Sequence, residues 1–198
     1  MSATSAPFGL RPAFHPSGLD RAQALANGIP SAFNTDIFKG QPVRYQTTAI
    51  GGTLGTITPA TTSGAWSGAF AGVQWTDTTG RARVSNYWPA NTAYTAGSCV
   101  AYFYNDANIV YEIQADGSMA QTTIGNEYTF TNVTSGSTTT GLSACTLGSA
   151  TGAGAGNQGQ MRVVDLAPYV DNAWGDAYTI VRVVNSQSQF FGSVTAIA

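Results

Sequence analysis

Charged side chains are scarce in this chain. Asp, Glu, Lys and Arg make up 9% of its 198 residues, and Lys39 is the sole lysine, whereas charged residues make up about 25% of an ordinary soluble domain. Thr, Ser, Asn and Gln supply polarity instead. A surface this neutral provides little repulsion between copies of the chain. It favours a subunit that stays packed against neighbours, the alternative being an ordinary β protein with a Thr/Ser surface.

The few cations are also scattered, and the net charge is -2. Nucleic-acid binding requires clustered Lys and Arg facing phosphates, so we expect no nucleic-acid partner. No run approaches the about 20 apolar residues of a membrane-spanning helix, so we expect no membrane contact. The N-terminus lacks the basic and apolar regions of a secretory signal, which predicts a protein made and kept in a cytoplasm.

Cysteine and histidine are rarer still. Cys99 and Cys145 lie far apart in the sequence, each among small or apolar residues, so we expect two buried, reduced and unreactive thiols. His15 is the only histidine, and it sits between Phe14 and Pro16 with no histidine or cysteine near it in the sequence. It is therefore a poor general base and a poor metal ligand, and we expect a structural or solvent-facing role.

Three further patterns resemble sites but lack the required context. Residues 154–159 (GAGNQG) match G-x-G-x-x-G, yet a nucleotide site needs a strand before this motif and a helix after it. Asp171 and Asp176 flank Trp174 as a sugar-binding edge would, but turn-capping acids around a core tryptophan explain the pattern better. The third pattern is a set of possible oxygen ligands that lacks the spacing of a calcium loop, and it comprises Asn105, Asp106, Asn108 and Glu112. We therefore expect no catalytic residue, cofactor or metal, and hence no enzyme.

Helix signals are nearly absent. The best candidate, LDRAQALA at residues 19–26, is two turns at most and ends at Asn27-Gly28, a helix-stop signal. Elsewhere β-favouring residues form short runs separated by turn signals such as DTTG at 77–80, the pattern of an all-β fold. We predict a β-sandwich or a β-tulip-like barrel. The expected strands cover residues 42–47, 68–75, 83–87, 98–104, 109–114, 127–132, 142–147, 160–166 and 178–184.

The turn signals and low-complexity stretches also suggest how the chain is divided. We expect an extended N-terminal arm over residues 1–35, a β domain over 36–105 and a second β lobe over 106–198. The alternative is that both β parts form one domain, because a hairpin near residue 105 could lie within one sandwich. The Gly/Ser/Thr-rich stretches at 51–68 and 134–159 are expected to be loops or edge strands.

The segment SAPFGLRPAFHPSGL, residues 5–19, is too apolar for a flexible tail and too rich in proline for a helix. Its prolines restrict the backbone to extended or turn conformations, which lowers the entropy lost on docking. We therefore expect it to cross to a neighbouring subunit. The residues expected to form this interface are Phe8, Leu10, Arg11, Phe14 and His15.

Four phrases of the sequence carry a resemblance. They are FKGQPV at 38–43, GAFAGVQWTDTTGRARVSNYWPA at 68–90, TAGSCVAYFYNDANIVYEIQADGS at 95–118 and DNAWGDAYTIVRVVNSQSQF at 171–190. Together they resemble a family of tailed-bacteriophage structural proteins, in an order similar to that of head decoration (cement) proteins. The resemblance implies a non-enzymatic virion protein, assembled in the bacterial cytoplasm, that binds as a homotrimer to the outside of the head and clamps the major capsid protein.

Two other functions stay open at this point. A tail tube or fibre subunit would also be rich in β-strands and of similar size. A carbohydrate-binding adhesin module would use exposed aromatic side chains to stack on sugars. The aromatic residues that suggest the adhesin are Trp88, Tyr94, Tyr102, Tyr104 and Trp174.

Overall fold

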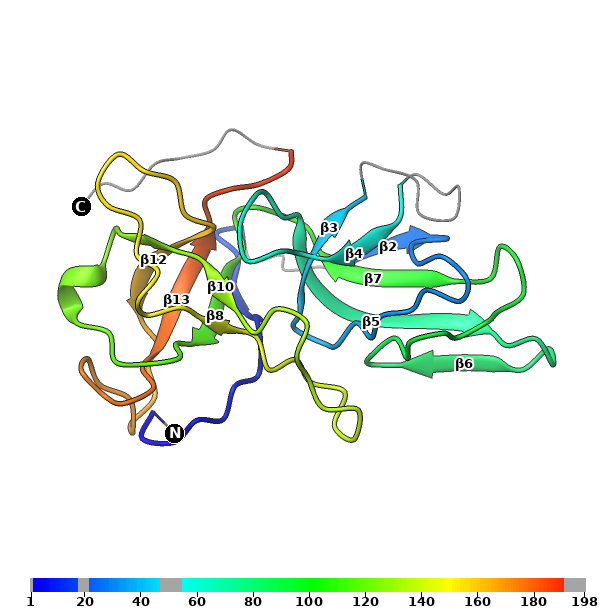
Figure 1. Cartoon of the computed structure of the whole chain (residues 1–198), viewed down its shortest axis with the longest axis horizontal. Coiled ribbons are helices and arrows are strands. Elements are labelled where there is room, and N and C mark those ends of the chain that lie inside the picture. Colours follow the sequence, from blue (N-terminus) through cyan, green and yellow to red (C-terminus); the bar gives the residue numbers. More distant parts are fainter. Residues whose placement is uncertain (1, 18–21, 47–54, 191–198) are drawn as a thin grey trace.

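The computed structural model describes residues 2–17, 22–46 and 55–190, and this part of the chain is built from antiparallel strands. Its one helical element is a single 3-10 turn, η1 (Gln121–Thr123). Figure 1 shows an elongated molecule with strands β2 to β7 in one half and β8 to β13 in the other. The all-β prediction is confirmed.

A six-stranded sheet forms one half of the molecule. Five of its strands have the order β2-β7-β5-β3-β4. The sixth, β6, lies outside this order and forms a hairpin with β5. The turn of this hairpin is the DTTG segment that the sequence indicated as a turn. Asp77 Oδ1 stabilises it by accepting hydrogen bonds from the backbone N–H groups of Thr79 and Arg81. The strands are β2 (Gln23–Ala26), β3 (Pro42–Tyr45), β4 (Ile57–Pro59), β5 (Gly68–Thr76), β6 (Ala82–Ser85) and β7 (Val100–Tyr104).

A five-stranded sheet in the order β1-β8-β13-β12-β9 and a two-stranded sheet of β10 and β11 form the other half. Their strands are β1 (Arg11–Phe14), β8 (Val110–Gln114), β9 (Glu127–Tyr128), β10 (Phe130–Thr131), β11 (Thr146–Leu147), β12 (Met161–Leu166) and β13 (Ile180–Asn185). Among the described residues, none of the three sheets closes into a barrel. The expectation of a barrel is therefore not met, and open antiparallel sheets take its place.

Each of the nine expected strand runs overlaps at least one observed strand, with Thr47 lying outside the described residues. The expected helix at 19–26 is wrong over its described part, because Gln23–Ala26 is strand β2, paired antiparallel with β7. Residues 19–21 lie outside the described part. A two-turn helix is marginal in water, whereas pairing with β7 satisfies the backbone groups of this segment. Asn27, with φ of 53°, ends the strand and not a helix.

Strand β4 lies at an edge of its sheet, within the stretch 51–68 that was expected to form loops or edge strands. Strand β1 was not expected, and together with β2 it changes the picture of the N-terminal segment. The stretch expected to be a free arm is shared between the two halves: β1 pairs with β8 in the five-stranded sheet, and β2 pairs with β7 in the six-stranded sheet. The chain changes sheets again between the end of β7 and the start of β8. Both halves thus contain segments that are distant in sequence.

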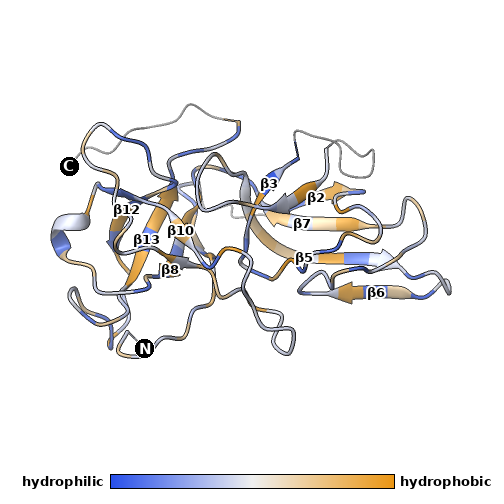
Figure 2. Ribbon diagram, in the orientation of Figure 1, coloured by the Kyte–Doolittle hydropathy of each residue, from blue (hydrophilic) through white to orange (hydrophobic). Residues whose placement is uncertain are grey.

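Each large sheet has its own hydrophobic core. Phe70, Trp88 and Phe103 belong to the cluster of the six-stranded sheet. Val181 and Val183 of β13 belong to the other cluster, while Arg182 between them is only half-buried. Buried and half-buried side chains thus alternate over these three residues, as in a strand with one face on a core, and Figure 2 shows β13 as largely apolar.

Trp66 connects the two halves. It lies in the loop between β4 and β5, which are strands of the six-stranded sheet, yet its side chain is fully buried in the core of the five-stranded one. Its ring meets Phe130 edge-on, with centroids 5.2 Å apart, and lies 6.0 Å from Tyr111. Its indole Nε1–H donates to the backbone oxygen of Gln160 at 3.1 Å. One half of the molecule thus supplies a core residue of the other.

Gln160 holds the same loop from the opposite side. Its buried side-chain Nε2 donates to the backbone oxygens of Thr61, at 3.0 Å, and Gly64, at 2.9 Å, while its Oε1 accepts from Phe130 N–H at 3.0 Å. Where the loop enters β5, a Cβ atom on Gly68 would lie 1.7 Å from the backbone oxygen of Tyr104. Only glycine allows the two backbones to approach this closely.

Replacement of Trp66 tests this connection. We expect Trp66→Ala to lower the free energy of unfolding by about 3–5 kcal/mol, because it leaves a large cavity between the sheets. Trp66→Phe should cost less, about 1–2 kcal/mol, because it removes mainly the hydrogen bond to Gln160. Urea denaturation followed by circular dichroism measures both. Val84→Ala, at a residue 83% exposed, is the control, and a Trp66→Ala variant no less stable than this control would contradict the role of Trp66.

Both cysteines are protected from solvent by burial. Cys99 and Cys145 are free and fully buried. Burial raises the pKa of Cys99 to about 11 and that of Cys145 well above its usual range. Because the thiolate is the reactive form, the folded protein should react with a thiol reagent such as DTNB at pH 8 far more slowly than the denatured protein, which should release both equivalents at once. Rapid reaction of either thiol in the folded protein would show that its site opens.

Candidate functional site

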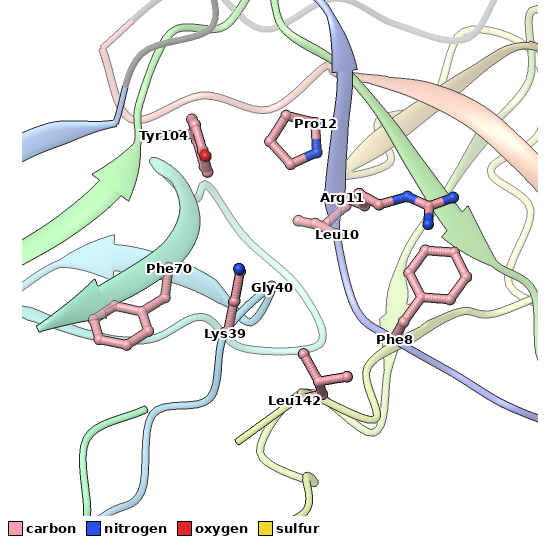
Figure 3. A pocket seen from close by; sticks show the side chains of 9 residues that line it. All are labelled: Phe8, Leu10, Arg11, Pro12, Lys39, Gly40, Phe70, Tyr104 and Leu142. Atoms are coloured by element: carbon pink, nitrogen blue, oxygen red, sulfur yellow. The ribbon is translucent and has the colours of Figure 1, made fainter. Parts of the chain in front are cut away.

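The largest hollow along the N-terminal segment is a groove of about 370 Å³ between the two halves of the molecule (Figure 3). We call it the waist groove. The N-terminal segment forms one wall. The other is formed by residues of β5, β7 and the segment before β3, together with Leu142 from the loop between β10 and β11. Three of the five residues expected at an interface line it. Its lining consists of Phe8, Leu10, Arg11, Pro12, Lys39, Gly40, Phe70, Tyr104 and Leu142.

Two glycines fix the course of the N-terminal segment along the groove. Leu10 N–H donates to the backbone oxygen of Gly40 at 2.7 Å, and Gly40 N–H donates to that of Phe70 at 2.7 Å. Gly9 has φ of 72° and Gly40 has φ of 81°, both in the left-handed region. A Cβ on Gly9 would lie 2.5 Å from the Gly40 oxygen. The two segments can therefore cross only where both lack side chains.

A row of charged side chains holds β1 against its sheet. Arg11, Glu112 and Arg182 are cross-strand neighbours on β1, β8 and β13. The buried Glu112 carboxylate accepts from Arg11 Nη2 at 2.7 Å and lies 3.6 Å from Arg182 Nε. The Tyr169 hydroxyl also donates to it. Opposite charges on facing strands stabilise the pairing, and here they attach the N-terminal strand.

The two phenylalanines of the expected interface lie at either end of this row. The Arg11 guanidinium lies 4.8 Å from the centre of the Phe8 ring, and that of Arg182 lies 5.7 Å from the centre of the Phe14 ring. These are cation–π distances. A continuous chain of contacts therefore runs from Phe8 in the waist groove to Phe14 at the end of β1.

Phe14 lines a second, smaller hollow. This hollow has a volume of about 240 Å³ and is lined by Phe14, Val110, Val164, Asp165 and Arg182. Phe14 is 46% exposed, and Val164 is exposed to a similar degree. We call the waist groove, the charged row and this hollow together the docking surface, because they lie in sequence along one N-terminal segment.

The structure places the five expected interface residues differently from one another. Leu10 is only 2% exposed and belongs to the chain's own core. Phe8 is half-buried, whereas Arg11 and Phe14 are exposed. Pairing of the segment within its own chain thus leaves Arg11 and Phe14 as the side chains that a neighbour can reach most fully.

His15 is held by two partners. Its Nε2 lies 2.9 Å from a carboxylate oxygen of Asp106, and its Nδ1 accepts from the backbone N–H of Ser17 at 3.0 Å. Since Nδ1 accepts a hydrogen bond, Nε2 carries the ring hydrogen and donates a hydrogen bond to Asp106. The backbone N–H of Asn108, followed by His15, holds the pKa of Asp106 below its usual range. His15 thus anchors the end of β1 to the β7–β8 turn.

The other patterns of the sequence do not assemble into a reaction centre. No group of three or more His, Cys, Asp or Glu side chains within the described residues could hold a metal ion. Residues 154–159 form a loop before strand β12, and Gly159 N–H donates to the buried Glu127 carboxylate at 2.7 Å. Asp176 Oδ2 accepts from Ala173 N–H at 2.7 Å, as a turn-capping acid does. None of the described helices is long and apolar enough to cross a membrane.

The aromatic residues that suggest a sugar-binding face do not gather on one surface. Trp88 is fully buried and packs edge-on against Trp75 and Tyr94. The Tyr94 hydroxyl donates to the backbone oxygen of Ile29 at 2.7 Å. Trp174 packs against the core of the other half. These side chains support the fold.

Sequence reasoning missed Lys39, Glu112 and Tyr169 as members of the docking surface. Glu112 carries a readable signal, because it is the one charged residue of the strand VYEIQ. Lys39 and Tyr169 lie in loops, where no local pattern assigns a partner. Compared with protein-family models, curated proteins and solved structures, the chain matches none. The resemblance to phage virion proteins accordingly stays a prediction.

Removal of the Glu112 carboxylate tests the charged row. We expect Glu112→Ala to lower the free energy of unfolding by about 1–3 kcal/mol, because it leaves Arg11 and the half-buried Arg182 without their shared acceptor. Protection of the β1 amides from hydrogen exchange should fall with it. Arg83→Ala, which breaks the more exposed pair with Asp77, is the control and should cost less than about 1 kcal/mol. Unchanged protection of β1 would show that the row does not attach the strand.

Proposed function

We propose that this chain is a virion protein of a tailed bacteriophage that decorates the assembled head and clamps neighbouring capsid subunits without catalysis. The docking surface is the observation that carries the proposal. It exposes Phe14 and Val164 beside half-buried charges, a combination of apolar and charged groups suited to protein contacts. The low overall charge and the four resembling sequence phrases support the same reading. In this proposal the open sheets pack as a β-sandwich with a second β lobe.

The partner segment can be described by its chemistry. Arg11 and Lys39 both line the waist groove, and no acidic residue is among the described side chains that line it. Its remaining lining is mostly apolar, with Phe8, Phe70 and Leu142 among the contributors. The occupant that fits best is an extended segment of the major capsid protein with an apolar side chain next to an acidic one. The acid would face the two cations, while the apolar side chain would fill the groove.

Clamping follows from binding equilibria. A protein that binds the assembled shell and not its separate subunits stabilises the shell by mass action. In a homotrimer, three docking surfaces engage several capsid subunits together, so the combined affinity exceeds that of any one contact. The weak charge of the chain allows such copies to lie close to one another on the head.

The proposal predicts binding to phage heads. Purified protein added to undecorated, expanded heads should bind at micromolar concentration and raise the temperature at which the heads release DNA. Phe14→Ser should weaken this binding about tenfold or more, because it removes an exposed aromatic anchor. Co-sedimentation and a thermal-release assay measure the two effects.

Val84→Ser is the matched control, since it removes an exposed apolar side chain from β6 in the other half of the molecule. It should bind heads like the unchanged protein. Absence of binding at micromolar concentration, or equal binding by the Phe14 variant, would overturn the proposal. A mass in solution that grows into open polymers, in place of a closed trimer, would instead indicate a tail tube subunit.

A further inference from the structure

A third hollow, of about 480 Å³, lies where the two halves meet and shares no lining residue with the waist groove or with the hollow at Phe14. Its residues come from β2, from β3, from the β7–β8 turn and from the segment after β13. Its volume falls within the about 300–1,000 Å³ typical of small-molecule sites. The lining residues are Gln23, Tyr45, Asn105, Asp106, Asn108 and Phe190.

Two aromatic rings form an apolar platform in this hollow. The ring centres of Tyr45 and Phe190 lie 5.2 Å apart at an interplanar angle of 79°. Tyr45 also packs edge-on against the buried Phe103, 5.7 Å away, so it is fixed from beneath. Phe190 is 59% exposed and therefore presents its ring to the hollow and to solvent. The exposed ring is therefore available to a ligand that enters the hollow.

The backbone beneath the platform is fixed as well. Gln189 Oε1 accepts from Tyr45 N–H at 2.7 Å, and Gln189 Nε2 donates to the Tyr45 backbone oxygen at 3.1 Å. The same residue donates its own backbone N–H to the oxygen of Trp66. Gln189, which follows β13 in the chain, is thus attached to two segments of the six-stranded half. A preformed platform of this kind costs little conformational entropy on binding.

Polar planar groups face the platform. Asn105 Nδ2 donates to Gln23 Oε1, while Asn105 Oδ1 and Gln23 Nε2 make no hydrogen bond to any residue that the structure describes. Asn108 donates from its backbone N–H and its side chain to Asp106 Oδ1, at 2.8 and 3.1 Å. These contacts hold the pKa of Asp106 below its usual range. The hollow therefore offers amide donors, amide acceptors and one fixed carboxylate.

The chemistry of the lining excludes several ligands. No Lys or Arg is among the described residues that line the hollow, and the Asp106 carboxylate repels anions, so phosphates and nucleic acids are disfavoured. One carboxylate and a few amides are too few for a calcium site. A purely apolar ligand would exclude water from the polar side chains of the lining without replacing the hydrogen bonds that the water makes. The ligand must be neutral, rich in hydroxyl groups and apolar on one face.

We propose that this hollow binds a neutral saccharide. One face of a pyranose ring carries C–H groups that pack on an aromatic ring, here that of Phe190 with Tyr45 behind it. Its neighbouring hydroxyls each donate and accept, and so pair with Asn105, Asn108 and Asp106. The aromatic residues that the sequence suggested for sugar binding are not those of the site. The inference does not depend on the docking surface, because the two share no lining residue.

Saturation-transfer NMR with the full chain tests the site. The probes are the neutral methyl glycosides of glucose, galactose, mannose and N-acetylglucosamine, together with disaccharides of the same sugars. We expect at least one to bind with a Kd on the order of 1 mM and to receive saturation mainly on its ring C–H protons. Phe190→Ala and Asn108→Ala should each weaken binding about tenfold. Glucose 6-phosphate should bind more weakly than methyl glucoside, and this difference should shrink in Asp106→Asn.

Phe14→Ala is the matched control, since Phe14 is the other large exposed phenylalanine among the described residues, and this variant should leave sugar binding unchanged. Circular dichroism spectra and melting temperatures establish that the variants are folded. No binding of any neutral probe at about 10 mM would overturn the inference. Binding that survives both Phe190→Ala and Asn108→Ala would overturn it too, because the sugar would then lie elsewhere. Sugar binding without head binding would support this site and overturn the proposed virion role. Head binding without sugar binding would support the virion role and overturn this site.

Discussion

Insertion of Trp66 into the far core is the contact on which the arrangement of this molecule depends. The residue is carried by a loop of the six-stranded sheet, yet its ring packs against Tyr111 and Phe130 of the other half. Gln160 then uses its side chain to satisfy the backbone of that loop. Burial of a large aromatic ring supplies the energy, and the hydrogen bonds fix its position. The waist groove and the hollow lined by Tyr45 and Phe190 both lie between the two halves that Trp66 connects.

Local sequence patterns were sufficient for most strands and insufficient for the N-terminal ones. Runs such as MRVVDL and YTIVRVV alternate over enough residues to identify a strand without knowledge of its partner. QALA carries no such pattern and is a strand because β7 is available to pair with it. RPAF likewise becomes a strand only through β8, from which it is separated by about a hundred residues. Tertiary pairing overrides weak local preference in both cases.

The docking surface, like the strands, could be predicted from local sequence only in part. Composition identified an apolar segment with Arg11 and Phe14, and both are exposed in the structure. It could not reveal that Leu10 fills the chain's own core, because burial depends on Gly9 crossing Gly40. Nor could it reveal Glu112 as the acceptor for two arginines from different strands. The hollow proposed to bind a saccharide combines four separate segments and has no sequence signature in any of them.

The position of β8 also constrains the order in which the molecule can form. Its neighbours are β1, at residues 11–14, and β13, at residues 180–185. During synthesis β1 is made early and must wait, unpaired, until β8 and finally β13 have emerged from the ribosome. Contacts of such large sequence separation form slowly. Until then the apolar N-terminal segment is exposed to other nascent chains, and its three prolines, which resist regular strand pairing, protect it from premature association.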